Sequence, residues 1–191
     1  MDRKLLEASA TRIMNLRGLF AIPLGLLFIQ AGLGNLGWGV FVHNWVFVAG
    51  LVALGGVTLL IKLYYDANFG RVTQSPSREL RNTILSAIIF GLGLIGGSIL
   101  DFKLDLPISL FSVCFAIAML AWFALCIGLR PHHYVIWGAL LVAGLMPIWG
   151  SLDDRASVAW LPIGAATIIA GIFDHLTLVR QYGLDREGDH D

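Results

Sequence analysis

The residues best suited to chemistry stand at the ends of apolar segments. Asp174 and His175 are neighbours near the end of the last apolar segment, and His132 and His133 are neighbours in a short turn before the fifth. An aspartate beside a histidine could shape a polar site, but helical neighbours point about 100° apart, so the two do not form a dyad by themselves. The two turn histidines could bind a metal ion together with His175. Two adjacent histidines in a turn do not by themselves provide the three or four ligands of fixed geometry that a metal centre requires, so we expect no metal and no other cofactor.

Asp174 and His175 have a second interpretation, as a boundary cluster that anchors the end of a helix. In this interpretation Asp174 pairs with Lys62 or Arg71. The motifs of membrane-embedded enzymes are absent from the sequence, which contains neither H-E-x-x-H nor G-x-S-x-G, and no glycine-rich phosphate loop ending in Lys-Ser or Lys-Thr. The sequence therefore predicts no catalytic residue and no enzyme.

A third group of candidate residues follows the second apolar segment, in the sequence Tyr64-Tyr65-Asp66-Ala67-Asn68-Phe69-Gly70-Arg71-Val72. Exposed aromatic side chains beside an arginine can form a docking surface for another protein. They can equally be an aromatic belt at the membrane interface, followed by a glycine turn. We hypothesise a cytosolic working face that acts by protein contact and comprises Tyr64, Tyr65, Phe69, Arg71, His175 and Arg180.

Six apolar segments must position these residues. They run approximately over 16–34, 45–65, 83–100, 107–129, 134–150 and 158–178. Hydrophobic residues make up 57% of the chain and charged residues only 14%, whereas about a quarter of the residues of a soluble domain are charged. Each segment is close to the ~20 residues that a helix needs to cross ~30 Å of hydrocarbon. The sequence thus predicts an all-α polytopic protein, a bundle of six transmembrane helices.

The basic residues predict how this bundle is oriented. Of the 13 lysines and arginines, only Lys103 and Arg155 fall on one side of the segments, and the other eleven fall on the opposite side. Basic loops stay in the cytoplasm during insertion, so both termini are expected inside. We expect a cytosolic amphipathic segment over 1–15, a membrane domain over 16–180 and a cytosolic tail over 181–191, in a bacterial cytoplasmic membrane.

Small residues recur four positions apart in every segment, which lets helix backbones approach closely in lipid. We expect Gly93 and Gly97 to lie at such a helix–helix contact. The middles of the segments carry no Asp, Glu, Lys, Arg or His, the residues that mark proton relays and ion paths. The polar residues within the segments could line a path or could bond to their own helix; they are Gln30, Asn35, Thr58, Ser86, Ser98 and Thr167.

Two short stretches carry a resemblance. With the Tyr-Tyr…Phe-Gly-Arg-Val loop at 64–72 and the Asp-His-Leu-x-Leu-x-Arg ending at 174–180, the chain resembles small bacterial six-helix integral membrane proteins of unassigned function. The resemblance covers these two stretches alone. It implies no activity and no catalytic residue.

The lack of chemical motifs favours a non-catalytic accessory or regulatory subunit of a larger membrane complex. The alternative is a small permease or channel for a neutral or apolar solute. A contiguous apolar lipid-facing groove or a flat aromatic patch would favour the subunit, and a polar stripe shared by several helices would favour the permease. The expected partners are the lipid bilayer and another membrane protein or a second copy of the chain. The net charge of zero gives no attraction to nucleic acid.

Overall fold

The protein is all-helical. The computed structural model describes residues 13–70, 76–149 and 152–182, and for Arg78, Leu152 and Asp153 it describes the backbone alone. Within these ranges the regular elements are α-helices, short 3₁₀-helices and π-helical turns, without a strand, which confirms the all-α part of the predicted fold class. The larger part of the predicted amphipathic segment (1–12) and of the predicted tail (183–191) lies outside the described residues.

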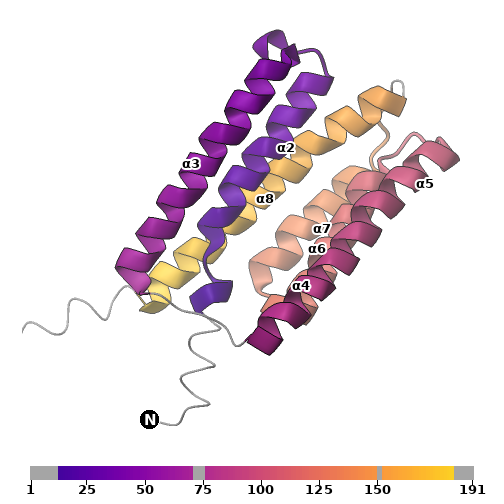
Figure 1. The fold of residues 1–191 in the computed structure, drawn as a ribbon. Coiled ribbons are helices and arrows are strands. Elements are labelled where there is room, and N and C mark those ends of the chain that lie inside the picture. Colours follow the sequence, from indigo (N-terminus) through magenta and orange to yellow (C-terminus); the bar gives the residue numbers. More distant parts are fainter. Residues whose placement is uncertain (1–12, 71–75, 150–151, 183–191) are drawn as a thin grey trace, which may run out of the picture.

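The helices form two groups that lie side by side (Figure 1). The first helix group consists of η1 (Gly18–Phe20), α2 (Ala21–Asn35), η2 (Gly39–Val42), α3 (Asn44–Phe69) and the long α8 (Leu152–Tyr182). The second helix group consists of α4 (Pro76–Gly91), η3 (Leu92–Gly96), α5 (Gly97–Leu104), α6 (Leu110–Trp122), η4 (Phe123–Ile127) and α7 (Pro131–Leu145). α4, η3 and α5 follow one another as a single rod, because η3 is a π-helical turn within a continuous helix.

In the part of the chain that the structure describes, five helical stretches are long and apolar enough to cross a membrane, so the chain has the composition of a multi-pass membrane protein. They are Ile13–Asn35, Asn44–Phe69, Glu79–Leu104, Leu110–Ile127 and Asp154–Tyr182. The segment predicted over 134–150 is α7, which has only 15 residues and a length of about 22 Å. The chain leaves the helix at Met146, whose backbone is extended. The sixth predicted span is therefore shorter than the hydrocarbon layer it would have to cross.

Glycines determine how the first helix group packs. A Cβ atom on Gly18 would lie 2.0 Å from the carbonyl oxygen of Gly171, and one on Gly25 would lie 2.6 Å from that of Gly164. Real Cβ atoms do not approach so closely, so α2 and α8 can cross at this distance only because neither helix has a side chain at these points. α3 packs mainly against α2 and contributes few buried residues.

In the second helix group, Gly93 and Gly97 both lie against α6. A Cβ atom on Gly93 would be 2.6 Å from Cβ of Ala118, and one on Gly97 would be 3.0 Å from Cβ of Cys114. The buried core is built around α6, α7 and α8, and its largest side chain is Trp137, which is fully buried. This core holds the two helix groups together along α8.

An ion pair fastens α8 to the second helix group at one end of the bundle, which we call the Arg155 end. Arg155 bonds Asp105 and donates a hydrogen bond of 2.8 Å to the carbonyl oxygen of Leu106. Nearby, Ser109 caps α6 by accepting a hydrogen bond of 3.1 Å from the backbone N–H of Ser112. These contacts keep the start of α6 next to the start of α8.

Candidate functional site

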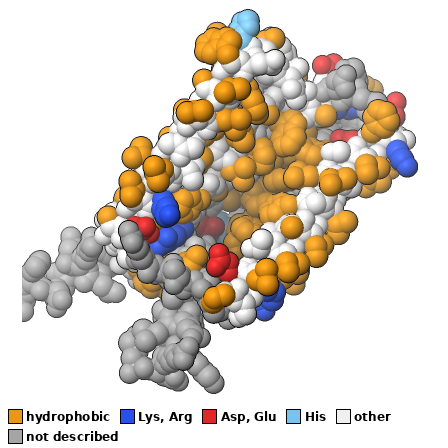
Figure 2. Space-filling view, in the orientation of Figure 1, with side chains coloured by type: hydrophobic (Ala, Val, Ile, Leu, Met, Phe, Trp, Pro, Cys, Tyr) orange, Lys and Arg blue, Asp and Glu red, His pale blue; other side chains and the backbone are white. Residues whose placement is uncertain are grey.

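A cavity of about 760 Å³ lies between the two helix groups. η1 and α2 form one wall, α4 and α6 form the facing wall, and α8 forms the base. Figure 2 shows this region as a hollow lined with hydrophobic side chains, with acidic groups near its lower end. A volume of this size is typical of sites for small organic molecules.

Aromatic side chains dominate the walls of the cavity. The rings come from η1, α2, α4, α6, η4 and α7, and they are Phe20, Phe28, Phe90, Phe115, Trp122, Phe123 and Trp137. Most of their contacts are edge to face or tilted, for instance Phe28 with Phe115 at a centroid distance of 5.9 Å and Phe90 with Trp122 at 5.6 Å, while Phe123 and Trp137 are stacked. The cavity therefore presents a rigid, mostly apolar surface to whatever occupies it.

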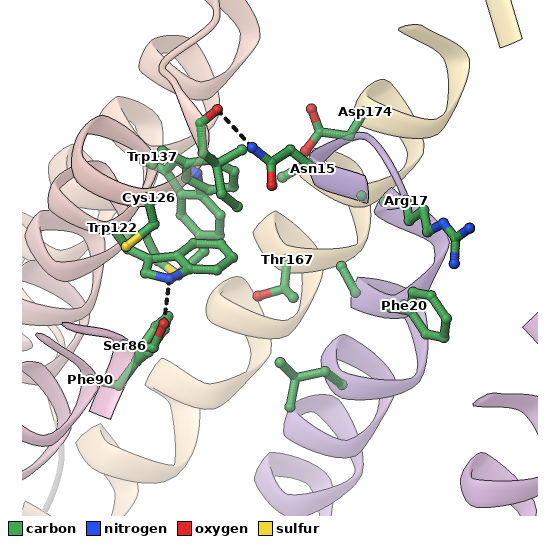
Figure 3. A pocket seen from close by; sticks show the side chains of 18 of the residues that line it. Asn15, Arg17, Phe20, Ser86, Phe90, Trp122, Cys126, Trp137, Thr167 and Asp174 are labelled. Carbon is green, nitrogen blue, oxygen red and sulfur yellow. Dashed lines mark hydrogen bonds between the residues drawn. The ribbon is translucent and has the colours of Figure 1, made fainter. Parts of the chain in front are cut away.

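Polar lining residues gather toward one end of the cavity, which we call the Asp174 end. Figure 3 shows Asn15, Arg17 and Asp174 there, with Thr167 deeper along α8. Asn15 donates a hydrogen bond of 3.3 Å to the carbonyl oxygen of Ile127 and so joins the first helix group to η4. The guanidinium of Arg17 extends away from the tryptophans, toward α3.

Asp174 is the centre of a buried cluster that joins α8 to the start of α7. Its carboxylate pairs with the guanidinium of Arg130, and its Oδ1 lies 3.0 Å from Nε2 of His132 and 3.2 Å from Nε2 of His133. The predicted partner Lys62 is wrong, because the structure pairs Asp174 with these three residues; the other predicted partner, Arg71, lies outside the described residues. The cluster fastens α8 to the second helix group at the Asp174 end, as Arg155 does at the other.

The ligand atoms of His132, His133 and Asp174 all lie within 4.8 Å of one another, close enough to hold a metal ion. The backbone N–H of Arg130, however, donates to Nδ1 of His133 over 3.3 Å. A ring that accepts at Nδ1 carries its proton on Nε2 and donates it to the carboxylate. This tautomer offers Asp174 a proton and leaves no lone pair on Nε2 for a metal. The geometry thus supports a carboxylate held by an arginine and two imidazoles.

His132 lies just before the predicted span over 134–150. Burial lowers its pKa, and the neighbouring His133 lowers it further. A neutral ring can still donate one hydrogen bond to Asp174. The single full charge needed to balance the carboxylate then comes from Arg130.

The residues of the predicted cytosolic working face lie partly inside the protein. Tyr64, Tyr65, Phe69 and His175 do come together, with ring centroids 5.5–6.3 Å apart. Tyr65 is fully buried; its hydroxyl accepts a hydrogen bond of 3.0 Å from the N–H of Leu19 and lies 3.2 Å from Nδ1 of His175. Tyr65 therefore joins η1, α3 and α8, and only its neighbours are available to a partner.

Of the two remaining members of the predicted face, the structure describes only one. Arg180 is exposed near the end of α8. Arg71 lies outside the described residues, so its place relative to the aromatic cluster is open. The protein-contact role of this face stays a prediction.

Most polar residues proposed to line a path bond to their own helix. The hydroxyls of Thr58, Ser86, Ser98 and Thr167 each donate to the carbonyl oxygen four residues earlier, over 2.7–2.8 Å. Only Ser86 and Thr167 line the cavity. Ser86 also accepts a hydrogen bond of 2.8 Å from Nε1 of Trp122 across the α4–α6 contact. These residues form no continuous polar stripe.

Three buried side-chain polar atoms of the described residues lack a hydrogen-bond partner, and all three belong to residues that line the cavity. They are Nε of Arg17, Oδ1 of Asn82 and Nε1 of Trp137. Such atoms are rare in folded proteins, because each has lost its bonds to water without replacing them. No sequence motif marks Asn82 or Trp137 as functional residues.

No protein-family model, curated protein or solved structure matches the chain. The geometry of the cavity is therefore the basis for a functional assignment.

Proposed function

We propose that the chain is a small permease that binds a neutral or apolar solute in the cavity between its two helix groups. The cavity carries this proposal: it is large enough for a small organic molecule, it is walled by aromatic rings, and its residues come from both helix groups. A site shared between two helix groups can change shape when the groups move against each other, as transport requires. The proposal selects the second of the two functions that the sequence allows. It rests on the cavity between the two helix groups and not on the polar stripe expected of a permease, which the residues Thr58, Ser86, Ser98 and Thr167 do not form.

The composition of the walls supports an apolar solute that comes from the bilayer. Lipid tails are as apolar as the cavity, so a molecule gains no hydrophobic free energy by leaving the bilayer. Its affinity depends instead on packing against the rings and on hydrogen bonds to the few polar groups at the Asp174 end.

A bulky substitution at the cavity wall tests the proposal. Leu24 lines the cavity and is partly exposed, so Leu24→Trp should fill part of the space without disturbing the α2–α8 contact. Purified protein in liposomes should accelerate the movement of a fluorescent long-chain alcohol between leaflets, and Leu24→Trp should slow it. Val52→Trp places the same side chain on the exposed face of α3 and should leave the rate unchanged. Equal rates with and without wild-type protein would refute the proposal.

We also propose six spans with both termini in the cytoplasm of a bacterial cell. The basic residues support this orientation, and α7 lies beside α6 and α8 as a sixth, shorter helix. Reporter fusions after Lys103 and Arg155 should read external, and fusions after Arg71, Arg130 and Asp191 should read internal. An external C-terminus would refute this topology.

A second candidate function, the accessory subunit, is favoured by α3. The most apolar window of this span contains no buried residue, so its outer face is free to meet lipid or the helix of another protein. Changing Phe69, which is partly buried, and Arg71 to alanine should release a partner that co-purifies in mild detergent. If the partner stays bound while the purified protein transports a solute, the subunit function is excluded.

A further inference from the structure

We infer that the cavity takes the hydrocarbon chain of a lipid, which enters from the bilayer through a side opening between α2 and α4 while the head group stays at the membrane interface. The inference rests on the proposed function and names the class of its solute, a long-chain lipid, and the route that this solute takes. Four observations carry it: the side opening, the depth of the cavity, the aromatic rings at its deep end and the pairing of its charges.

The cavity opens sideways, between α2 and α4. α2 packs against α3 and α8, and α4 packs against α6, but α2 and α4 do not pack closely against each other. Figure 2 shows the hollow on this side of the molecule, in the orientation of Figure 1. The lining residue Leu24 of α2 is 47% exposed, and the lining residues Ser86 and Phe90 of α4 are partly exposed. Because both helices belong to stretches that are apolar enough to span a membrane, the opening faces hydrocarbon.

The depth of the cavity matches one leaflet of the bilayer. Its lining runs from Asn82 to Leu94 on α4 and η3, and from Phe115 to Ile127 on α6 and η4. Each run covers 12 positions, which corresponds to about 18 Å of helix. Half of a hydrocarbon layer of ~30 Å is ~15 Å. A lipid that moves sideways into the cavity can therefore keep its hydrocarbon chain at the depth that the chain has in the bilayer.

Three aromatic rings meet at the deep end of the cavity, opposite the Asp174 end. Phe28 of α2 contacts Phe115 of α6 and Trp160 of α8, with ring centroids 5.9 and 5.2 Å apart. We call these three rings the aromatic floor. A hydrocarbon chain that extends inward from the Asp174 end packs against rings along its length and ends at the floor. This shape fits an amphiphile with its head group at the interface and its methyl end at the floor.

Both charged side chains among the described residues that line the cavity are already paired. Arg17 lies 3.6 Å from Asp66, and Asp174 pairs with Arg130. A charged head group that followed the hydrocarbon chain inside would lose its water without gaining a counter-ion, which is costly. The head group is therefore more stable at the interface, and the affinity comes from the hydrocarbon chain.

Photolabelling with two isomeric probes tests the orientation of the lipid. Each probe is 1-hexadecanol with a diazirine, placed near the hydroxyl end in one and near the methyl end in the other. The probes are photolysed with the wild-type protein in nanodiscs, and the adducts are located by peptide mass spectrometry. The hydroxyl-end probe should label the Asp174 end, at Asn82 and Cys126, and the methyl-end probe should label the floor, at Phe28 and Phe115. Excess 1-hexadecanol should displace both probes. 1-Butanol at the same mole fraction in the membrane should displace neither, because its chain is too short to reach the floor.

Two variants of α2 test the side opening. Leu24→Trp places a large side chain in the opening and should lower the yield of both probes at least about five-fold at subsaturating concentration, because overpacking an occupied site weakens binding. Leu26→Trp is the matched control. Leu26 lies on the same helix, is 42% exposed and does not line the cavity, so this variant should leave both yields unchanged.

The outcomes separate this inference from the proposed function. Saturable labelling of the cavity by both probes at the same residues, or in the reverse order, would overturn the orientation of the lipid and leave the permease proposal intact. Displacement by 1-butanol as strong as that by 1-hexadecanol, or equal yields in the two α2 variants, would overturn the inference as well. Absence of saturable labelling in the cavity would overturn both proposals. The two probes are compared on the wild-type protein, so they decide the orientation even if Leu24→Trp fails to fold.

Discussion

At the scale of single residues, the most consequential side chain is Asp174. Its carboxylate forms an ion pair with Arg130 and accepts hydrogen bonds from His132 and His133, and all four groups are largely shielded from solvent. A carboxylate in such a place is tolerated only because every partner is present. Asp174 therefore holds the end of α8 against the start of α7 and closes the cavity at that end.

The first prediction concerns this cluster. Asp174→Asn should destabilise the protein by about 3–5 kcal/mol, because it leaves the charge of Arg130 buried and unpaired. The measurement is the free energy of unfolding in mild detergent. Asp105→Asn breaks the ion pair at the Arg155 end, but Asp105 is 71% exposed, so this control should cost at most about 1 kcal/mol. Equal losses from the two variants would contradict the role of Asp174.

The second prediction concerns Tyr65. Tyr65→Phe removes the acceptor of the Leu19 N–H while keeping the ring, and a buried donor without a partner costs about 1–3 kcal/mol. Tyr64→Phe changes an exposed neighbour and should alter the free energy of unfolding by less than about 0.5 kcal/mol. If the two substitutions were equivalent, the hydroxyl of Tyr65 would not join η1 to α3.

At the scale of the elements, backbone proximity between helices determines the shape of the molecule. η1 and α2 approach α8 through Gly18, Gly25, Gly164 and Gly171, and η3 and α5 approach α6 through Gly93 and Gly97. In lipid, such close packing drives helix association, as the hydrophobic effect does in water. Both contacts leave the space between α2 and α4 unfilled, and this space is the cavity.

The third prediction tests the α2–α8 contact. Gly171→Ala would place a Cβ atom 2.4 Å from the carbonyl oxygen of Gly18, which forces the helices apart and should lower stability by about 1–3 kcal/mol or more. Gly55→Ala is the matched control, because nothing lies within 4 Å of its Cβ position. Since alanine is the better helix former, that control should be neutral or stabilising by up to about 1 kcal/mol. Thermal melting in detergent distinguishes the two.

The fourth prediction applies the same reasoning to α6. Replacing Gly93 and Gly97 by leucine should lower the melting temperature, because overpacking costs about 1–3 kcal/mol per site. The neighbouring Gly96 has open space at its Cβ position, so Gly96→Leu should be tolerated. An unchanged melting temperature for the double variant would mean that this face of the rod meets lipid.

At the scale of the whole molecule, the helical architecture could be predicted from local sequence and the site could not. Runs of apolar residues identify each helix because they reflect the thickness of the bilayer. The sequence does not predict where α7 ends, because the apolar run continues through Met146 and Pro147 after the helix has ended. Hydropathy indicates which residues avoid water, but it does not show where the backbone hydrogen bonding of a helix ends.

The candidate site depends on contacts between distant parts of the chain. Arg130 and Asp174 are 44 positions apart, and Trp122 and Ser86 are 36 positions apart. No periodicity encodes such pairs, and Asp174 has several basic residues within plausible reach in the sequence. The unpartnered atoms of Asn82 and Trp137 become visible only when all neighbours are in place.

The most direct test of the central claim is to map where a neutral amphiphile binds. A long-chain alcohol with a diazirine in its chain is added to the protein in nanodiscs, photolysed, and located by peptide mass spectrometry. We expect adducts on cavity residues such as Phe28, Phe90 and Met119, reduced in Leu24→Trp and displaced by excess unlabelled alcohol. Adducts spread over the exposed face of α3, with none in the cavity and no displacement, would contradict the account.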